Sequence, residues 1–343
     1  MATSQEPTSL ADHLAGLLSG DRFAALRDSV VPALVDAIAG TSRALRDAQQ
    51  VALAGTANTF GDDQLNVDVL AENLIRDALA TCPSVSTASS EEDPVERPAQ
   101  KKDKDGSDTA TAVSASDPET YTVAFDPLDG SSIIAPNWTV GTIIGVWQGN
   151  TALEQEPASR QIVSILGVYG PRTTAIIAIR IPGQVKATCF EVGINDDSGF
   201  NDAEIVRAEV KLSQPPFKTR YFAPANLRAA AEDERYMKLV THYIQSKYTL
   251  RYSGGLVPDV VHALVKGHGI YVSPVTSASK AKLRRLYELF PLSLIVECAG
   301  GKAVDPANGD NILDRPLRDI DERGGLICGT TEEVDFVVQT LVQ

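Results

Sequence analysis

Residues 121–134, YTVAFDPLDGSSII, decide the fold. The aromatic and β-branched residues at the start of this stretch predict a strand, which stops abruptly at the run Asp-Pro-Leu-Asp-Gly. Pro127 removes a hydrogen-bond donor and Gly130 tolerates the backbone angles of a tight turn, so two carboxylates are held at the strand end. Ser131 and Ser132 follow, with the free backbone N–H groups of the next element, which suit a phosphate oxygen. Carboxylates for a hard cation beside donors for phosphate suggest metal-assisted phosphate chemistry.

A polar turn that caps a helix is the alternative interpretation of this stretch. Asp, Gly, Pro and Ser dominate turns in general, so composition alone does not choose between a turn and a site. The rest of the chain has to decide.

The whole chain sets limits on both architecture and partners. Its 343 residues suffice for one large domain or two medium ones, and a net charge of −14 argues against nucleic acid or an anionic membrane as the main partner. The four cysteines lie far apart without a CxxC pair, which argues against a disulfide framework or a zinc site and suits a reducing compartment. The sequence shows no secretory signal and no membrane span, so we expect a cytoplasmic protein.

Helical and strand patterns alternate along the chain and predict a layered α/β architecture. The predicted helices cover residues 10–18, 31–38, 65–81, 232–246 and 257–266, a stretch at 282–298 interrupted at Pro291, and a closing helix capped at Thr331. The predicted strands cover residues 121–125, 139–147, 173–179, 185–192, 248–252, 269–272 and 326–328, with a loop at 195–202. Pro215-Pro216 is the expected boundary between an N-terminal half, 1–213, and a C-terminal half, 214–343. Residues 94–118 have hardly an apolar side chain and predict a flexible surface insertion.

Acidic residues recur in clusters that no histidine joins, and oxygen-only ligation favours Mg²⁺ or Mn²⁺ over Zn²⁺. The clusters are Asp62 with Asp63, Asp68, Glu91 with Glu92, Asp126 with Asp129, and Glu288. A basic set follows later in the chain: Arg228, Arg251, Lys280, Lys282, Arg284 and Arg285. Taken singly, each has a simpler explanation, because Asp68 suits a helix start, the glutamate pair can open a solvated tract, and basic side chains are usually on the surface.

The stretch FDPLDGSS resembles the metal and phosphate motif of the sugar bisphosphatases, a branch of the Mg²⁺-dependent, Li⁺-sensitive phosphatase superfamily. Further segments resemble that family in its own order, from about residue 58 to the C-terminus. They are FGDDQLNVDVLAENL (60–74), SEED (90–93), VGTIIGVW (140–147), YTLRYSGGLVPDV (248–260), KAKLRRLYE (280–288) and ECAGGKA (297–303). Within the family, the sequences of these segments resemble the sedoheptulose-1,7-bisphosphatases more than the fructose-1,6-bisphosphatases.

The resemblance implies a fold and an activity. The fold is an αβαβα sandwich of two sheets with helical layers, and the cofactor is Mg²⁺, two or three ions per site, with Mn²⁺ possible in its place. The implied reaction is hydrolysis of the C1 phosphate of sedoheptulose 1,7-bisphosphate by a metal-activated water. A fructose-1,6-bisphosphatase, an enzyme acting on both sugars, and a catalytically silent scaffold are the alternatives.

The resemblance also implies roles for individual residues. The metal ligands would be Glu91, Asp126, Asp129, Glu288 and the backbone carbonyl of Leu128. Asp68 and Glu92 would orient and deprotonate the attacking water, and Gly130, Ser131 and Ser132 would hold the departing phosphate. The sugar and its second phosphate would contact Asn226, Arg251, Tyr252 and Lys282. In relatives the arginine that matches Arg251 reaches in from a neighbouring subunit, which implies a homodimer or homotetramer.

Overall fold

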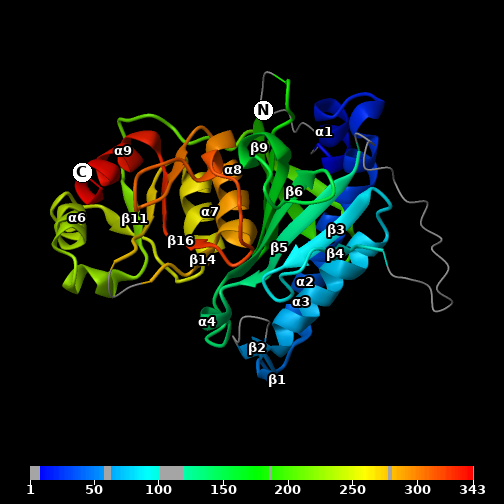
Figure 1. Cartoon of the computed structure of the whole chain (residues 1–343), viewed down its shortest axis with the longest axis horizontal. Helices are drawn as coiled ribbons and strands as arrows, with labels where there is room; N and C mark the ends of the chain where they lie inside the picture. Colours follow the sequence, from blue (N-terminus) through cyan, green and yellow to red (C-terminus); the bar gives the residue numbers. More distant parts are fainter. Residues whose placement is uncertain (1–7, 58–62, 101–118, 185–186, 277–279, 343) are drawn as a thin grey trace, which may run out of the picture.

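Two β-sheets alternate with three helical layers along the long axis of the molecule (Figure 1). The structure is a computed structural model that describes residues 8–57, 63–100, 119–184, 187–276 and 280–342. From one end to the other, the layers are the N-terminal helices, an eight-stranded sheet, a central pair of helices, a five-stranded sheet and an outer pair of helices. The expected layered αβαβα class is confirmed.

The N-terminal helices form the first layer, as their apolar periodicity predicted. They are α1 (Leu10–Leu17), α2 (Val31–Asp47) and α3 (Asn66–Ala80), with short helical turns η1 (Asp21–Phe23) and η2 (Leu26–Val30) before α2. Their apolar stripes pack on the sheet strands in one continuous core, so this layer covers a sheet. A small ribbon of β1 (Leu53–Ala57) and β2 (Asp63–Leu65) precedes α3.

The large sheet has the strand order β10-β9-β8-β7-β6-β5-β3-β4. Its strands are β3 (Val85–Ser90), β4 (Arg97–Pro98), β5 (Tyr121–Asp129), β6 (Val140–Gln148), β7 (Gln161–Tyr169), β8 (Thr173–Ile179), β9 (Thr188–Asn195) and β10 (Gly199–Arg207). Neighbouring strands are antiparallel except β3 and β5, which run parallel. Helices cover both faces, so its central strands are buried throughout, which explains their nearly continuous apolar sequences.

Several parts of this sheet differ from the sequence-based expectation. Strand β3 is rich in Ser and Thr and lacks the apolar pattern of a core strand, yet it is paired beside β5. The expected loop at 195–202 is shorter, because β10 begins at Gly199. Residues 94–100 begin the expected insertion and include β4, which pairs with β3, while the Gln100 side chain donates to the carbonyls of Cys82 and Val85; Val95, Arg97 and Pro98 are exposed. The rest of the expected insertion, 101–118, lies outside the described residues.

The second half supplies the other three layers. The central helices are α7 (Leu256–Lys266) and α8 (Phe290–Cys298), and the outer helices are α6 (Glu234–Gln245) and α9 (Thr331–Leu341). Between these pairs lies a sheet in the order β12-β11-β13-β17-β15, made of β11 (Tyr221–Pro224), β12 (Thr249–Leu250), β13 (Ile270–Ser273), β15 (Lys302–Val304) and β17 (Leu326–Gly329). The shorter elements are α4 (Ser131–Ile134), α5 (Pro157–Arg160), η3 (Leu227–Ala231), η5 (Ile312–Asp314), η4 (Arg285–Leu289), and the paired strands β14 (Leu283–Arg284) and β16 (Arg323–Gly324).

Pro291 does not interrupt a helix as expected. It lies in the first turn of α8, where a missing N–H costs nothing, directly after the π-helical turn η4. The predicted cap at Thr331 is also displaced, because Thr330 is the N-cap of α9 and makes no side-chain capping bond. Within the described ranges, no helix is both long and apolar enough to pass through a bilayer.

Candidate active site

A β-bulge shapes the end of β5, where the sequence suggested a turn. Asp126 pairs with Ile143 and Asp129 pairs with Gly141, so two residues of β5 face the single residue Thr142 of β6. In a regular strand, side chains three positions apart point to opposite faces. The extra residue in the bulge turns Asp126 and Asp129 to the same face of the sheet, toward the central helices. The strand thus continues through the motif and the turn begins only at Gly130, which has a φ of 101°.

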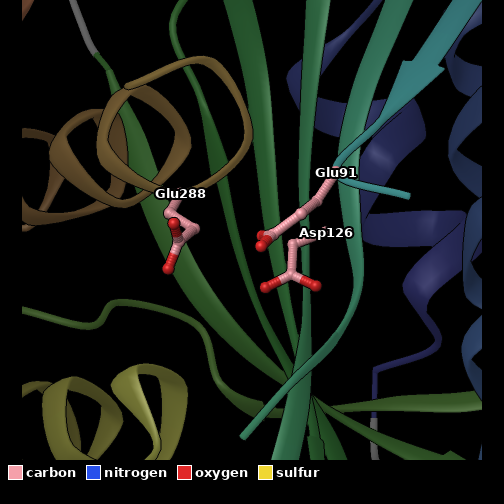
Figure 2. Close-up of side chains that lie close together, drawn as sticks. All are labelled: Glu91, Asp126 and Glu288. Atoms are coloured by element: carbon pink, nitrogen blue, oxygen red, sulfur yellow. The ribbon is translucent and has the colours of Figure 1, made fainter. Parts of the chain in front are cut away.

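Three carboxylates converge on this face from distant parts of the chain. Oxygens of Glu91, Asp126 and Glu288 all lie within 4.8 Å of one another. Figure 2 shows Glu91 and Asp126 side by side, with Glu288 facing them from η4. Burial raises the pKa of Asp126 and of Glu288 well above the usual range, and the charge of Glu91 raises both further. Such a set of oxygen ligands at close quarters fits a hard divalent cation, which would relieve their repulsion.

Arg284 is a buried cation beside this carboxylate cluster. Its guanidinium Nε lies 3.0 Å from Glu91, its Nη1 lies 2.7 Å from Asp321, and its backbone N–H donates to Glu288. The sequence placed Arg284 in the basic set, where a solvated surface charge was the simpler explanation; that explanation is wrong for Arg284 and Arg285, which are both buried. One guanidinium cannot neutralise three ionised carboxylates, so the cluster carries a net negative charge whenever all three are ionised.

Asp129 joins the metal motif to the central layer. Its two carboxylate oxygens accept hydrogen bonds from the backbone N–H groups of Leu256, at 3.1 Å, and Val257, at 2.7 Å, in the first turn of α7. The helix approaches closely because Gly141 has no side chain: a Cβ there would lie 2.5 Å from Val257. Burial raises the pKa of Asp129 to about 7, against the lowering effect of those two hydrogen bonds.

Asp68 and Glu92 form a second acidic pair next to the cluster. Asp68 lies in the first turn of α3, where its carboxylate accepts from the Leu65 backbone N–H at 2.9 Å, as a helix-start aspartate does. Glu92 follows β3 and accepts from the Gln64 side chain. The pKa of Asp68 is raised to about 6 and that of Glu92 to about 7, chiefly by burial and in smaller part by the neighbouring charge of Glu91. Asp62 and the side chain of Asp63 lie outside what the structure describes.

The residues expected to contact phosphate and sugar occupy two places. Ser131 and Ser132 are exposed at the start of α4, directly after Gly130. In the second half, Asn226 adopts a left-handed conformation, and its backbone N–H donates to the Tyr252 hydroxyl.

The two expected cations of the substrate site are both exposed. The guanidinium of Arg251 lies 5.7 Å from the centre of the Tyr221 ring, and Lys282 lies just before β14. A cavity of about 1050 Å³ is lined by Trp138, Arg251, Tyr252 and His262 among others. Among the described residues, none of the three clustered carboxylates lines it.

A buried carboxylate that the sequence did not single out holds the loop between Tyr252 and α7. Asp259 accepts from the backbone N–H of Ser253 at 2.6 Å, from its hydroxyl at 2.8 Å and from the N–H of Gly254 at 3.1 Å. Ser-Gly-Gly before a helix, with an aspartate in the first turns, is the only sequence signal for this arrangement.

Comparison with known proteins agrees with the geometry. The family model named fructose-1-6-bisphosphatase, N-terminal domain, matches residues 25–192, and the C-terminal domain model matches 216–342. The chloroplastic sedoheptulose-1,7-bisphosphatase of Triticum aestivum is 37% identical over 84% of this chain, which spans 66% of that protein, slightly less than two thirds. A class 1 fructose-1,6-bisphosphatase of Syntrophotalea carbinolica is 33% identical over 85% of this chain and 81% of its own length.

Solved structures agree as well. A Toxoplasma gondii protein with the provisional name sedoheptulose-1,7-bisphosphatase is 32% identical, with a TM-score of 0.80 over 97% of this chain and 98% of the other. A fructose-1,6-bisphosphatase of Leishmania major is 23% identical with a TM-score of 0.79, which bears on the fold alone. The chain belongs to the fructose-1,6-bisphosphatase family, whose members depend on divalent metal ions.

Proposed function

We propose that the protein is a Mg²⁺-dependent sedoheptulose-1,7-bisphosphatase, which releases the C1 phosphate and leaves sedoheptulose 7-phosphate. The observation that carries this proposal is the convergence of Glu91, Asp126 and Glu288, together with the Gly130 turn that follows the motif and leads into α4. The sugar is proposed from resemblance, because the plant and algal relatives that bear this name are 36–38% identical, against 32–33% for the bacterial fructose enzymes.

The metal site in this proposal is built from both halves of the chain. Glu91, Asp126 and Glu288 hold the ions, Asp129 contributes the lone pairs that its two hydrogen bonds leave free, and the Leu128 carbonyl at the bulge completes the set. Bound divalent ions would neutralise phosphate oxygens and lower the pKa of nearby water. We propose Mg²⁺, two or three ions per site, with Mn²⁺ as a substitute.

Asp68 and Glu92 orient the attacking water and take up its proton. The pKa values of about 6 and about 7 suit this role, since a general base works best when its pKa lies near the operating pH. Gln64 fixes one oxygen of Glu92, which leaves the other for the water. The charge of Asp68 adds to the raised pKa of Glu92, so Glu92 is the carboxylate of the pair that holds a proton more tightly.

The substrate is held on both sides of the metal cluster. Gly130, Ser131 and Ser132 bind the departing phosphate, while Asn226, Arg251, Tyr252 and Lys282 bind the sugar and its far phosphate. Binding energy from the far phosphate positions the reacting one. Arg251 is exposed, and the proposal includes a homodimer or homotetramer in which this arginine serves a neighbouring site.

The test is release of inorganic phosphate from sedoheptulose 1,7-bisphosphate and from fructose 1,6-bisphosphate, each over a Mg²⁺ titration. We expect release from both to require Mg²⁺ and kcat/KM to be higher for the seven-carbon sugar. No release from either sugar at any Mg²⁺ concentration would refute the activity. A higher kcat/KM for the six-carbon sugar would replace the substrate with the second candidate, which the greater coverage of the bacterial fructose enzymes favours.

A prediction for the substrate loop concerns Asp259. Asp259→Asn replaces one acceptor oxygen by an NH₂ group that faces the N–H donors of Ser253 and Gly254, so the loop that carries Tyr252 loses its anchor. We expect KM for the sugar bisphosphate to rise about tenfold, the equivalent of one charged hydrogen bond, with kcat changed far less. Steady-state kinetics at saturating Mg²⁺ measure this split.

The matched control is Asp233→Asn. Asp233 is the N-cap of α6 and also accepts from a backbone N–H, that of Tyr236, in the same half of the chain. It should lower the melting temperature without changing KM. Equal KM values for the two variants would show that Asp259 contributes to stability alone.

A further inference from the structure

The bulge in β5 leaves a backbone carbonyl in need of a donor, and a side chain of the next strand supplies it. Thr142 is the one residue of β6 opposite the two bulged residues of β5. Its hydroxyl donates to the Pro127 carbonyl at 2.7 Å. A bulge breaks the regular ladder of backbone bonds, so this hydroxyl takes the place of the missing backbone donor.

A tyrosine on the following strand completes the arrangement. The Tyr169 hydroxyl lies 2.6 Å from the Thr142 hydroxyl, and Thr142 has one hydrogen, which it gives to Pro127. Tyr169 is therefore the donor to Thr142. Burial raises the pKa of Tyr169, so this hydroxyl keeps its proton through the physiological range. The hydroxyls form a directed relay, Tyr169 to Thr142 to the Pro127 carbonyl.

The relay is buried between the large sheet and the N-terminal helices. Thr142 is fully buried, and Tyr169 belongs to the same core as the strands β5 to β9 and the N-terminal helices. Valine has nearly the shape of threonine and would fill this space without a polar atom. Burying a hydroxyl costs free energy unless it is hydrogen-bonded, so the bond to Pro127 is what makes threonine suitable here.

The Pro127 carbonyl stands between the two carboxylates of the metal motif. Asp126 precedes it and Asp129 follows two residues later, and the bulge is the reason that both face the central helices. Fixing this carbonyl fixes the bulge, and with it the direction of Asp126 and of the Leu128 carbonyl. Groups that orient metal ligands from behind in this way commonly tune metal affinity.

We propose that Thr142 and Tyr169 are positioning residues that hold the bulged metal motif in its ion-binding shape. This inference rests on the proposed function, because it assigns their effect to divalent-ion binding at Asp126. The side chains of Thr142 and Tyr169 lie on the opposite face of the sheet from the carboxylate cluster, so they act on it through the backbone of β5.

The experiment measures Mn²⁺ affinity by calorimetry and the Mg²⁺ half-saturation of phosphate release in the same full-length variants. Thr142→Val removes the hydroxyl and keeps the shape, so we expect ion affinity about tenfold weaker, with KM for the sugar little changed at saturating ion. Tyr169→Phe should also weaken ion affinity, but by a smaller factor, since the Thr142 hydroxyl still donates to the Pro127 carbonyl. Thr142→Ser keeps the hydroxyl, so its ion affinity should be close to that of the original protein.

The control is Thr122→Val on β5, the bulged strand itself, at the end of that strand far from the bulge. Thr122 is equally buried and donates to the Gly149 carbonyl at 3.0 Å, so its loss should cost similar stability. We expect its ion affinity to equal that of the original protein. Equal weakening in Thr122→Val and Thr142→Val, or unchanged affinity in both Thr142→Val and Tyr169→Phe, would overturn the proposal.

Two outcomes separate this inference from the proposed function. If the original protein binds Mn²⁺ but releases phosphate from neither sugar, the hydrolytic function fails and the relay is still judged by the calorimetric affinities of the variants. If the original protein binds no divalent ion, both proposals are refuted.

Discussion

Glu288→Gln is expected to reduce phosphate release by on the order of 10²–10³-fold, because it removes one of three carboxylates that surround the proposed ion. Glutamine has the same size and keeps an oxygen that can accept from the Arg284 N–H, so the surrounding fold is retained. Without ions, the variant should melt at a higher temperature than the original protein, because one buried like charge is gone. Phosphate release and thermal melting with and without Mg²⁺ measure the two effects.

The control for this prediction lies on the helix that follows. Glu297, in the last turn of α8, pairs with Arg180 at 2.6 Å and accepts from the Asn311 side chain. Glu297→Gln breaks an ion pair and should lower the melting temperature, while kcat changes little. Should Glu288→Gln retain full turnover, the acidic cluster would have no part in the reaction, and the silent-scaffold alternative would gain support.

The second large effect is on stability. In ion-free buffer, we expect the free energy of unfolding to increase by on the order of 3 kcal/mol when the pH is lowered from about 8 to about 6. The folded-state pKa values of Asp126, Asp129 and Glu288 lie above their unfolded values, with Asp129 at about 7. These groups therefore bind protons in the folded state first, so each gains stability as the pH falls through its folded pKa and loses it as the pH rises.

Divalent ions should favour the charged form of these carboxylates, whereas burial favours the neutral form. An ion binds the charged carboxylates, so the rise in melting temperature on adding Mg²⁺ should be larger at pH 8 than at pH 6, by the binding linkage. The variant with both Asp126→Asn and Glu288→Gln is the matched control, and its melting temperature should vary less with pH and with Mg²⁺. A melting temperature of the original protein that falls on acidification in ion-free buffer would contradict this account.

The sequence predicts this fold well where a local pattern determines the structure. The apolar stripes of α1, α2 and α7 and the continuous apolar runs of β6 and β8 identify those elements directly. Strand β3 escapes detection because its Ser and Thr side chains are buried by the pairing with β5, which is a tertiary effect. The same holds for Arg284, whose burial depends on carboxylates far away in the chain.

In the candidate site too, the sequence indicates the residue types but not the features that depend on tertiary structure. The local motif singled out Asp126, the acidic clusters included Glu91 and Glu288, and the resemblance made the three metal ligands; the structure brings them together. The bulge could not be predicted, because nothing local in a strand sequence says where an extra residue enters the ladder. Without it, a three-residue spacing would put Asp126 and Asp129 on opposite faces of the sheet. The hydroxyl of Thr142 is likewise inconspicuous in the sequence, since threonine is an ordinary strand residue.

The central helices α7 and α8 come from the second half of the chain but pack on the sheet of the first (Figure 1). The acidic cluster therefore forms only after the last quarter of the chain, which carries Glu288, has docked against strands made much earlier. Such long-range contacts form late in folding, because the chain must lose the entropy of closing a large loop before these contacts stabilise it. A divalent ion should thus slow unfolding and leave refolding nearly unchanged, which would make the bound protein resistant to proteolysis out of proportion to its equilibrium stability.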